Sequence, residues 1–237
     1  MDLDKKIDLY VDGLKLDQFD INFGIKIDGY TFNPSIFKKS GTKNYLDYCK
    51  KILEKTKNNP VSFEVIADDE DNIIKQAKIL SGLSNSVYVK VPIVYTNGKL
   101  TYNVIKNLSN ENIKMNITAI FTIEQIKNIL EPINATKNIL SVFAGRIYDA
   151  GYDAFSRVKE INEFVKSNSS CRVLWASPRM SYDYIAAIKS KTDIITMQPE
   201  QILKMKKFGK DLEQFSIETA NQFYKDAKTS GYKIFWT

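Results

Sequence analysis

The chain alternates between short runs of apolar, β-branched residues and longer stretches whose apolar residues have helical spacing. Eight runs have the length and composition of buried strands, namely Ile7–Val11, Ile27–Phe32, Val61–Ile66, Val87–Ile93, Ile113–Ile120, Ile139–Phe143, Arg172–Trp175 and Asp193–Met197. The intervening periodicity predicts five helices, over Asn44–Lys57, Asp69–Ser81, Thr122–Leu130, Tyr152–Lys166 and Tyr182–Lys189. The first connection, Gly13–Gly24, has the weakest helical pattern.

Repetition of strand and helix predicts parallel strands joined by helical crossovers. Eight units in 237 residues average about thirty residues each, the size of one βα unit. We therefore predict an α/β fold with one domain over 1–237, a (β/α)8 TIM barrel. An open, doubly wound sheet is the alternative, but no GxGxxG follows the first strand and no Walker loop is present.

A further apolar stripe follows the eighth strand, in the C-terminal segment 208–230. It predicts an extra helix over Lys210–Ser230, with an apolar face made by Leu212, Phe215, Ala220, Phe223, Tyr224 and Ala227. Such a face needs a covering surface. We expect this helix to pack either on the barrel or on a neighbouring subunit, so a homo-oligomer is one expectation.

Composition places the chain among ordinary globular proteins, with 43% hydrophobic and 26% charged residues. No apolar run approaches the ~18 residues of a membrane span. The N-terminus carries acids inside its short apolar stretch, unlike a secretory signal. We expect a cytoplasmic protein with no membrane partner.

The absence of histidine removes whole classes of chemistry. Ser-His and Cys-His triads are excluded, and so is any His-ligated metal site. The two cysteines, Cys49 and Cys171, form neither a CxxC motif nor a disulfide framework. We expect no metal, and catalysis by Lys, Asp, Glu, Tyr, Ser or Thr.

Charge is weakly informative about partners. The net charge is +6, but basic and acidic residues are interleaved, which indicates a solvated lysine-rich surface rather than a nucleic-acid site. Four of the 34 basic residues are arginine: Arg146, Arg157, Arg172 and Arg179. Where lysine is the usual cation, arginine more often marks a place that needs a planar, bidentate donor.

Several predicted strands carry polar residues near their C-terminal ends, where the active sites of such barrels form. These positions are Asp12, Thr31 with Asn33, Glu64 beside Ser62, Lys90, and Asn116 with Thr118. A barrel strand is covered on both faces, so charged side chains should be absent from it. Five strands that break this rule together predict one shared site.

Lys90 suggests the chemistry of that site. Burial disfavours the charged form of an amine, and a neutral amine forms a Schiff base with a carbonyl substrate. The protonated imine then withdraws electrons, so that a neighbouring C–C bond breaks or forms. Asp12, Glu64 and Thr118 are available as acid/base and hydroxyl helpers. The alternative for Lys90 is an ion pair with Glu64 that fills the centre of the barrel.

Two segments after late strands predict an anion site, 141–146 with the sequence SVFAGR and 176–179 with the sequence ASPR. Each places a Ser or Gly backbone near an arginine, Arg146 or Arg179, at a strand end. Late βα loops often bind phosphate in this fold. The alternative for each arginine is a surface salt bridge.

Seven runs, in order along the chain, resemble the transaldolase family of class I aldolases. They are YTFNPS, VSFEV, YVKVP, NITAIFT, SVFAGRI, LWASPR and DIITMQP. The resemblance spans about Ile7 to Pro199. Phe32 departs from it, because the family's usual run is TTNPS. The resemblance implies carbohydrate metabolism, with the pentose phosphate pathway as the usual setting, and no cofactor, since the lysine imine is the electron sink.

The resemblance also implies residue roles. Lys90 is the Schiff-base lysine and Asp12 the acid/base for the C4 hydroxyl proton. Glu64 and Thr118 hold the catalytic water. Asn33 and Ser141 match residues that contact the dihydroxyacetone end, Asn116 matches a polar neighbour of the lysine, and Arg146, Ser177 and Arg179 match the phosphate clamp. Thr31, which shares a strand face with Asn33, and Phe143 are also expected to bind substrate.

The family contains transaldolases and shorter fructose-6-phosphate aldolases, and two positions favour the first group. The aldolases carry a Gln at the position of Glu64. At the position of Phe143 they carry a Tyr, whose hydroxyl helps release free dihydroxyacetone. We expect a transaldolase that transfers dihydroxyacetone between sugar phosphates. The alternatives are an aldolase-type lyase and a non-catalytic barrel that binds a phosphosugar.

Overall fold

The computed structural model describes residues 7–133 and 137–234. Eight parallel strands close into a barrel in sequence order, and β1 pairs with both β2 and β8. The strands are β1 (Asp8–Asp12), β2 (Gly29–Thr31), β3 (Val61–Glu64), β4 (Val87–Pro92), β5 (Met115–Ile120), β6 (Ile139–Val142), β7 (Arg172–Trp175) and β8 (Ile194–Met197). The predicted (β/α)8 barrel is confirmed.

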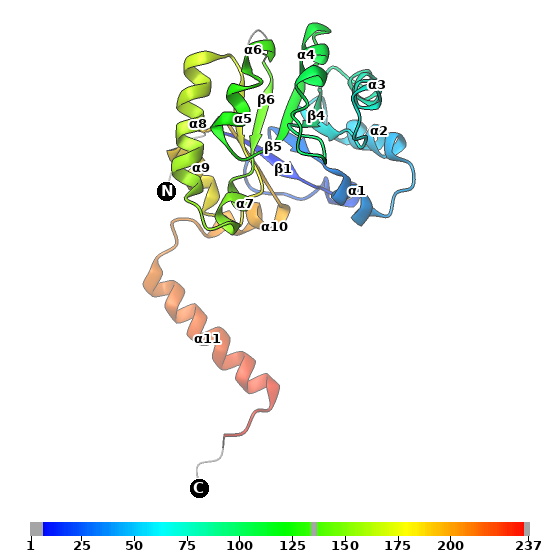
Figure 1. Ribbon diagram of the computed structural model, residues 1–237. Coiled ribbons are helices and arrows are strands. Elements are labelled where there is room, and N and C mark those ends of the chain that lie inside the picture. The colour runs from blue at the N-terminus through cyan, green and yellow to red at the C-terminus, as the bar shows by residue number, and fades with distance from the viewer. Residues whose placement is uncertain (1–6, 134–136, 235–237) are drawn as a thin grey trace.

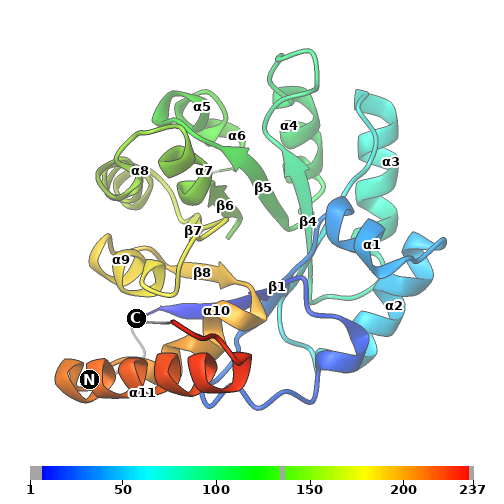
Figure 2. The ribbon, with the colours of Figure 1, turned by 90° about the horizontal axis from the view of Figure 1, so that it is seen from below.

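Helices surround the strands, as Figures 1 and 2 show. Along the chain they are η1 (Leu16–Gln18), α1 (Pro34–Ser40), α2 (Tyr45–Lys55), α3 (Glu70–Ser81), α4 (Tyr102–Asn110), α5 (Ile123–Lys127), α6 (Leu130–Ile133), α7 (Ala144–Asp149), α8 (Ala154–Asn168), α9 (Asp183–Lys189), α10 (Pro199–Lys204), η2 (Met205–Lys207) and α11 (Leu212–Ser230). The labels η1 and η2 mark single 3₁₀ turns.

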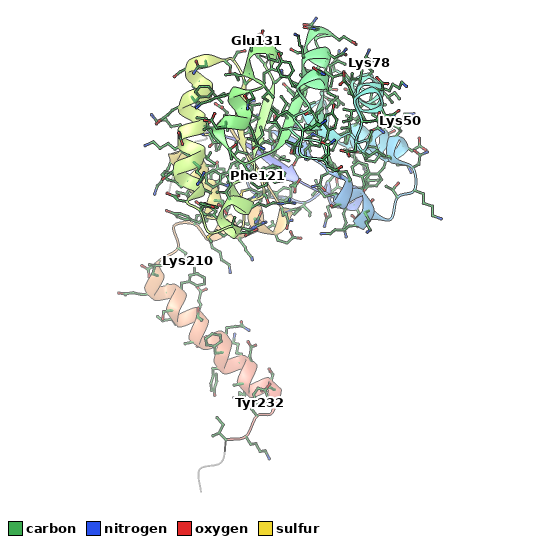
Figure 3. The ribbon with its side chains drawn as sticks, in the orientation of Figure 1. Lys50, Lys78, Phe121, Glu131, Lys210 and Tyr232 are labelled. Carbon is green, nitrogen blue, oxygen red and sulfur yellow. The ribbon has the colours of Figure 1, made fainter. Side chains whose placement is uncertain are left out.

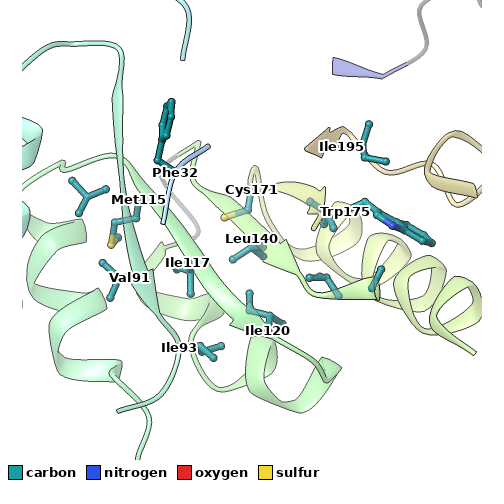
Figure 4. Close-up of a cluster of buried hydrophobic side chains, with 14 of the residues drawn as sticks. Phe32, Val91, Ile93, Met115, Ile117, Ile120, Leu140, Cys171, Trp175 and Ile195 are labelled. Atoms are coloured by element: carbon teal, nitrogen blue, oxygen red, sulfur yellow. The ribbon is translucent and has the colours of Figure 1, made fainter. Parts of the chain in front are cut away.

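Most of the hydrophobic core lies between the strands and these helices. Outward-facing strand residues such as Val91, Ile117 and Ile195 are fully buried there, and Figure 4 shows part of this layer. A second cluster fills the interior of the barrel, formed by Tyr10, Ile139, Leu174, Ala176 and Ile194. These residues alternate with the outward set, as the two-residue period of a strand requires.

Gly29 makes room for the largest interior side chain. A Cβ atom at this position would lie 2.6 Å from the Tyr10 ring. The strand register places Gly29 directly beside Tyr10. A glycine on β2 therefore lets the aromatic ring close the interior of the barrel beneath the polar residues above it.

The sequence predicted most helices but not all. The helices α1, α4, α7 and α10 were not predicted, and the first connection holds only the turn η1 instead of a helix. The single helix expected over Thr122–Leu130 ends at Lys127, and a separate short helix, α6, begins at Leu130. Side-chain caps mark where α3 and α8 begin. Asp69 and Asp153 each accept a hydrogen bond from a backbone N–H group in the first turn of the helix that follows.

The C-terminal helix α11 does not pack on the barrel, which corrects one of the two expectations for it. It projects away from the strands, and Figure 3 labels Lys210 and Tyr232 at its two ends. No residue of α11 is buried, and Phe223 is 68% exposed. Among the described residues, no helix combines the length and the apolar character needed to cross a bilayer.

We predict that a second copy of the chain covers α11. A lone helix of this length is marginal in water, because most helical stability comes from packing of an apolar face. The variant Phe223→Glu should shift the mass measured by light scattering towards that of the monomer. Gln222→Glu adds the same charge on the neighbouring position and should leave the assembly intact. Equal masses for wild type and Phe223→Glu would contradict this assignment.

Candidate active site

A cavity of about 110 Å³ opens at the C-terminal ends of the strands. It is lined by Asp12, Thr31, Asn33, Lys90, Thr118, Ser141, Phe143, Arg146, Ala176, Ser177, Pro178, Arg179, Thr196 and Gln198. The structure therefore brings together ten of the twelve site residues expected from the sequence. The other two, Glu64 and Asn116, lie directly behind the cavity wall in contact with lining residues.

Lys90 lies in the wall of the cavity and is only 6% exposed. The register places Glu64 of β3 opposite it, and the Nζ atom lies 3.0 Å from Glu64 Oε2. The same Nζ donates to the carbonyl oxygen of Phe32, at 3.3 Å. A buried ammonium requires a paired charge and further acceptors. The ion pair with Glu64, which was the alternative for Lys90, is present, and Lys90 also lines the cavity.

Asp12 ends β1 and pairs in register with Thr31 of β2. Thr31 donates its hydroxyl hydrogen to Asp12 Oδ1, at 2.8 Å. Burial raises the pKa of the Asp12 carboxyl, while the charge of Lys90 and the bond from Thr31 oppose that rise. A carboxyl with a raised pKa is suited to both accepting and returning a proton near neutral pH.

A bulge in β5 sets the direction of Thr118. The register with β6 shifts between Ile117 and Ile120, and Ala119 has φ of 59°. Such a bulge re-aims side chains and is common beside active sites. Thr118 lines the cavity, yet its hydroxyl oxygen is buried and has no protein hydrogen-bond partner. A water molecule or a substrate oxygen would satisfy it.

A hydrogen-bonded chain crosses the barrel behind the lysine. Asn116 donates to Ser62 Oγ at 3.0 Å, and Ser141 donates to Asn116 Oδ1 at 2.6 Å. All three residues are buried. Asn116 therefore holds Ser62 and Ser141 in place from outside the cavity, and Ser141 lines the cavity.

Asn33 caps a helix and also lines the cavity. Its Oδ1 atom accepts a hydrogen bond from Ile36 N at 3.1 Å and caps α1. The oxygen is used by the cap, so the amide nitrogen supplies the free donors.

The aromatic wall is formed by Phe143. Its ring lies 5.8 Å from that of Phe121, and the Arg146 guanidinium lies over its face, 5.2 Å from the centroid. This cation–π contact holds Arg146 at the rim. The expected arginine at this position therefore faces the cavity.

The second arginine, Arg179, is held by several neighbours. Its Nε donates to Asp149 Oδ1 at 2.9 Å, Nη2 also bonds to Asp149, and Nη1 donates to Ser177 Oγ at 3.2 Å. Asp183 accepts from the backbone N–H groups of Arg179 and Met180, each at 2.8 Å. The pair with Arg179 lowers the pKa of Asp149.

The loops that carry the two arginines meet at Gly145. A Cβ atom there would lie 1.6 Å from the carbonyl oxygen of Ser177, which itself has φ of 60°. Gly145 N also points to the carbonyl oxygen of Ala176, at 3.5 Å. The glycine therefore allows the β6 and β7 loops to touch.

The remaining arginines lie outside the site. Arg172 is bound to Asp8 at 2.7 Å, and the Arg157 guanidinium lies over the Tyr152 ring, 4.6 Å from its centroid. The sequence interpretation gave no role to two lining residues, Thr196 and Gln198, whereas Ala176 and Pro178 belong to the segment 176–179 that was expected to bind an anion. The available signal was the period of two, because Thr196 and Gln198 continue the inward face that Ile194 begins.

Residues 9–234 match the Transaldolase/Fructose-6-phosphate aldolase family. The chain belongs to this family. A probable transaldolase of Methanococcus vannielii is 34% identical over 193 residues, which cover 81% of this chain and 85% of that protein. One of Thermoanaerobacter is 30% identical over 209 residues, covering 88% and 90%. The chain is thus an enzyme of the transaldolase/aldolase family.

Solved structures support the fold alone. Thiamine phosphate pyrophosphorylase from Pyrococcus furiosus has a TM-score of 0.55 at 13% identity, covering 84% of this chain and 91% of the other. A structure described as "Native KDPGal structure" has a TM-score of 0.54 at 11% identity, covering 94% and 96%. Family membership therefore rests on the sequence match.

We predict that Asp12→Asn stabilises the fold at pH 8. The folded-state pKa of Asp12 lies above the ordinary 3.8, so ionised Asp12 destabilises the fold, and this penalty is lost as the pH falls below 3.8. Calorimetry should show a higher Tm for the variant at pH 8 and a shrinking difference towards pH 4. The exposed Asp20→Asn is the control and should show no such trend. A lower Tm for Asp12→Asn at pH 8 would mean that pairing with Lys90 outweighs desolvation.

Proposed function

We propose that this enzyme transfers a dihydroxyacetone unit from a ketose phosphate to an aldose phosphate through a Schiff base on Lys90. The observation that carries the proposal is the buried Lys90 amine at the cavity wall, with the Asp12 carboxylate and two arginines lining the same cavity. Membership of the family supports it. A non-catalytic phosphosugar-binding barrel would not need a lysine buried beside Glu64.

Imine formation starts when the neutral Lys90 amine attacks the C2 carbonyl of the ketose. Glu64, 3.0 Å from Nζ, is close enough to take the ammonium proton and return it to the leaving oxygen. One water molecule leaves as the C=N bond forms. The resulting iminium carries the positive charge that the unreacted ammonium carried, so Glu64 still balances it.

Cleavage then breaks the C3–C4 bond. Asp12 takes the proton of the C4 hydroxyl, the C4 oxygen becomes the carbonyl of the departing aldose, and the bond electrons move into the iminium to give an enamine. The acceptor aldehyde reverses these steps: its carbon bonds to C3, and its oxygen takes the proton back from Asp12. Burial supports this role because it raises the pKa of Asp12 and so makes the carboxylate a better proton acceptor.

Release requires water to attack the iminium carbon. The unsatisfied, buried hydroxyl of Thr118 and the carboxylate of Glu64 are the groups we assign to that water. Addition of water restores the C2 carbonyl and frees the Lys90 amine, so atoms and charge return to their starting state. Asn33 and Ser141 are assigned to the hydroxyls of the three-carbon unit.

The phosphate group is assigned to the rim of the cavity. Arg146, Ser177 and Arg179 line one side of it and offer charged donors to a dianion. Asp149 fixes the guanidinium of Arg179 through two of its nitrogens. Such a fixed arginine orients a sugar phosphate at low entropic cost.

Phe143 favours transfer over the alternative, an aldolase-type lyase. A lyase must protonate the enamine before water releases dihydroxyacetone. The ring of Phe143 contacts Phe121 and Arg146 and offers no proton. The enamine should therefore persist until an aldehyde arrives. Operation in the pentose phosphate pathway and in the cytoplasm stay predictions.

The imine predicts a covalent adduct at one lysine. Fructose 6-phosphate and borohydride should add a three-carbon fragment to Lys90, because reduction converts the imine to a stable amine. Mass spectrometry of peptides should locate it, and Lys90→Met should abolish it. Lys106→Met, on the exposed face of α4, should leave it unchanged. Labelling at another lysine across several ketose phosphates would exclude this mechanism.

The phosphate assignment predicts a split between substrates. Arg179→Ala should raise KM for phosphorylated aldoses by roughly 10- to 100-fold, since a charge-assisted pair is lost. KM for unphosphorylated glyceraldehyde should change little. Arg157→Ala removes an arginine that lies outside the cavity and serves as the matched control. Steady-state kinetics with both acceptors measure the split, and equal effects on both would place the phosphate elsewhere.

Phe143 predicts the balance between transfer and cleavage. Without acceptor, fructose 6-phosphate should release little glyceraldehyde 3-phosphate, and erythrose 4-phosphate should restore turnover. Phe143→Tyr should raise acceptor-independent cleavage, because the added hydroxyl supplies a proton. A coupled assay for glyceraldehyde 3-phosphate, with and without acceptor, measures both.

Phe121→Tyr is the control, since it adds a hydroxyl to the neighbouring ring that does not line the cavity. Cleavage by the wild type at a rate that matches transfer would identify the enzyme as a lyase.

A further inference from the structure

Thr196 is a cavity residue that has no role in the proposed reaction. It lies on the inward face of β8 and is 5% exposed. Its hydroxyl oxygen lies 2.6 Å from that of Thr31, and Thr31 donates to Asp12 Oδ1 at 2.8 Å. β1 pairs with both β2 and β8, so these three side chains come from adjacent strands. They form a continuous, buried hydrogen-bond chain that ends on a carboxylate.

The direction of this chain follows from the number of hydrogens. Each hydroxyl has one hydrogen to donate. Thr31 uses its hydrogen at Asp12 Oδ1, which as a carboxylate oxygen only accepts. In the short contact between the two threonines, Thr196 is therefore the donor and Thr31 the acceptor. The hydroxyl dipoles all point towards Asp12, and such aligned bonds polarise one another.

We propose that Thr196 is a positioning residue that acts on Asp12 through Thr31. The chain keeps Oδ1 occupied by a donor, so Oδ2 is the oxygen that takes the proton of the substrate. When Oδ2 gains that proton, Thr31 and Thr196 keep their hydrogens where they are. The proton exchange at Asp12 therefore requires no rearrangement of the chain. The inference rests on the proposed function, in which Asp12 is the acid/base.

The charged groups around Asp12 do not depend on Thr196. Lys90 on β4, Glu64 on β3 and Lys39 on α1 act on the carboxyl by charge. The hollow beside Asp12 also carries Lys15, which precedes η1, and Glu200 of α10. Replacing one hydroxyl leaves all of these charges in place. A change in the titration of Asp12 in such a variant therefore reports the hydrogen-bond chain.

The test compares Thr196→Val with Thr196→Ser in otherwise unchanged protein. Valine has nearly the shape of threonine without the donor, whereas serine retains the donor. The readout is the pKa of the Asp12 carboxyl in the ligand-free protein, from carbon NMR with Asp12→Asn to assign the signal. Thr196→Val should raise this pKa by about 0.5 unit or more, because Thr31 then donates to the carboxylate without the polarisation that Thr196 supplies. Thr196→Ser should return it towards the wild-type value.

Two further variants separate this role from a loss of packing. Ile195→Val trims the neighbouring residue on the helix-facing side of β8 and should leave the carboxyl pKa unchanged. If Thr196→Val does not fold, Thr196→Cys, which differs from Thr196→Ser only in carrying a thiol, a weaker donor, should give an intermediate shift. The acidic limb of the pH profile of kcat/KM should move by the same amount as the carboxyl pKa.

An unchanged Asp12 pKa in both Thr196→Val and Thr196→Cys would overturn the inference. So would the same shift in Thr196→Ser as in Thr196→Val, because the hydroxyl would then not be its cause. The NMR titration needs no substrate. If wild-type enzyme formed no adduct at Lys90, the proposed function would fall, and the carboxyl titration would still decide whether the chain exists.

Discussion

The buried ammonium of Lys90 is the constraint on which the architecture of this site depends. A charge inside a barrel is tolerated only when it is paired and hydrogen-bonded. The register of parallel strands meets that need, because it sets Glu64 of β3 directly beside Lys90. On the other side it sets Asn116 of β5, whose amide continues into bonds with Ser62 and Ser141. The upper part of the barrel interior is therefore rich in polar side chains.

The apolar interior cluster, which includes Tyr10 and Leu174, closes the barrel beneath this polar layer. Among the described residues, the cavity that Lys90 lines opens at the C-terminal ends of the strands. A site closed on one side keeps its charges in a poorly solvated environment, which strengthens the interactions among Lys90, Glu64 and Asp12. The inward-facing residues of each strand thus form both the apolar cluster and the polar layer above it, because side chains alternate between the two faces of a strand.

That alternation explains how much of the site could be predicted from the sequence. Lys90 and Glu64 stand out because each interrupts a short apolar run, and the side-chain period of two assigns them to the interior. Thr196 does not interrupt its run in this way, because threonine is common in strands. The period of two places it on the inward face, but its partner Thr31 is distant in sequence. The pairing of Arg179 with Asp149 was equally hidden, since it joins α7 to the β7 loop in three dimensions.

The helices were harder to predict than the strands for a related reason. The short helices α1 and α7 begin directly at the ends of strands and present few apolar residues. Periodicity is informative only over several turns. For α11 periodicity predicted the helix itself, but periodicity does not identify the surface that covers an apolar face.

The contact between Gly145 and Ser177 has a consequence for changing what this enzyme accepts. Because no Cβ fits between them, the loops after β6 and β7 cannot be redesigned one at a time. Substitutions that move one loop displace the other, so their effects on substrate preference will not be additive. Directed evolution of the phosphate end should therefore vary both loops in a single library, with Gly145 left unchanged.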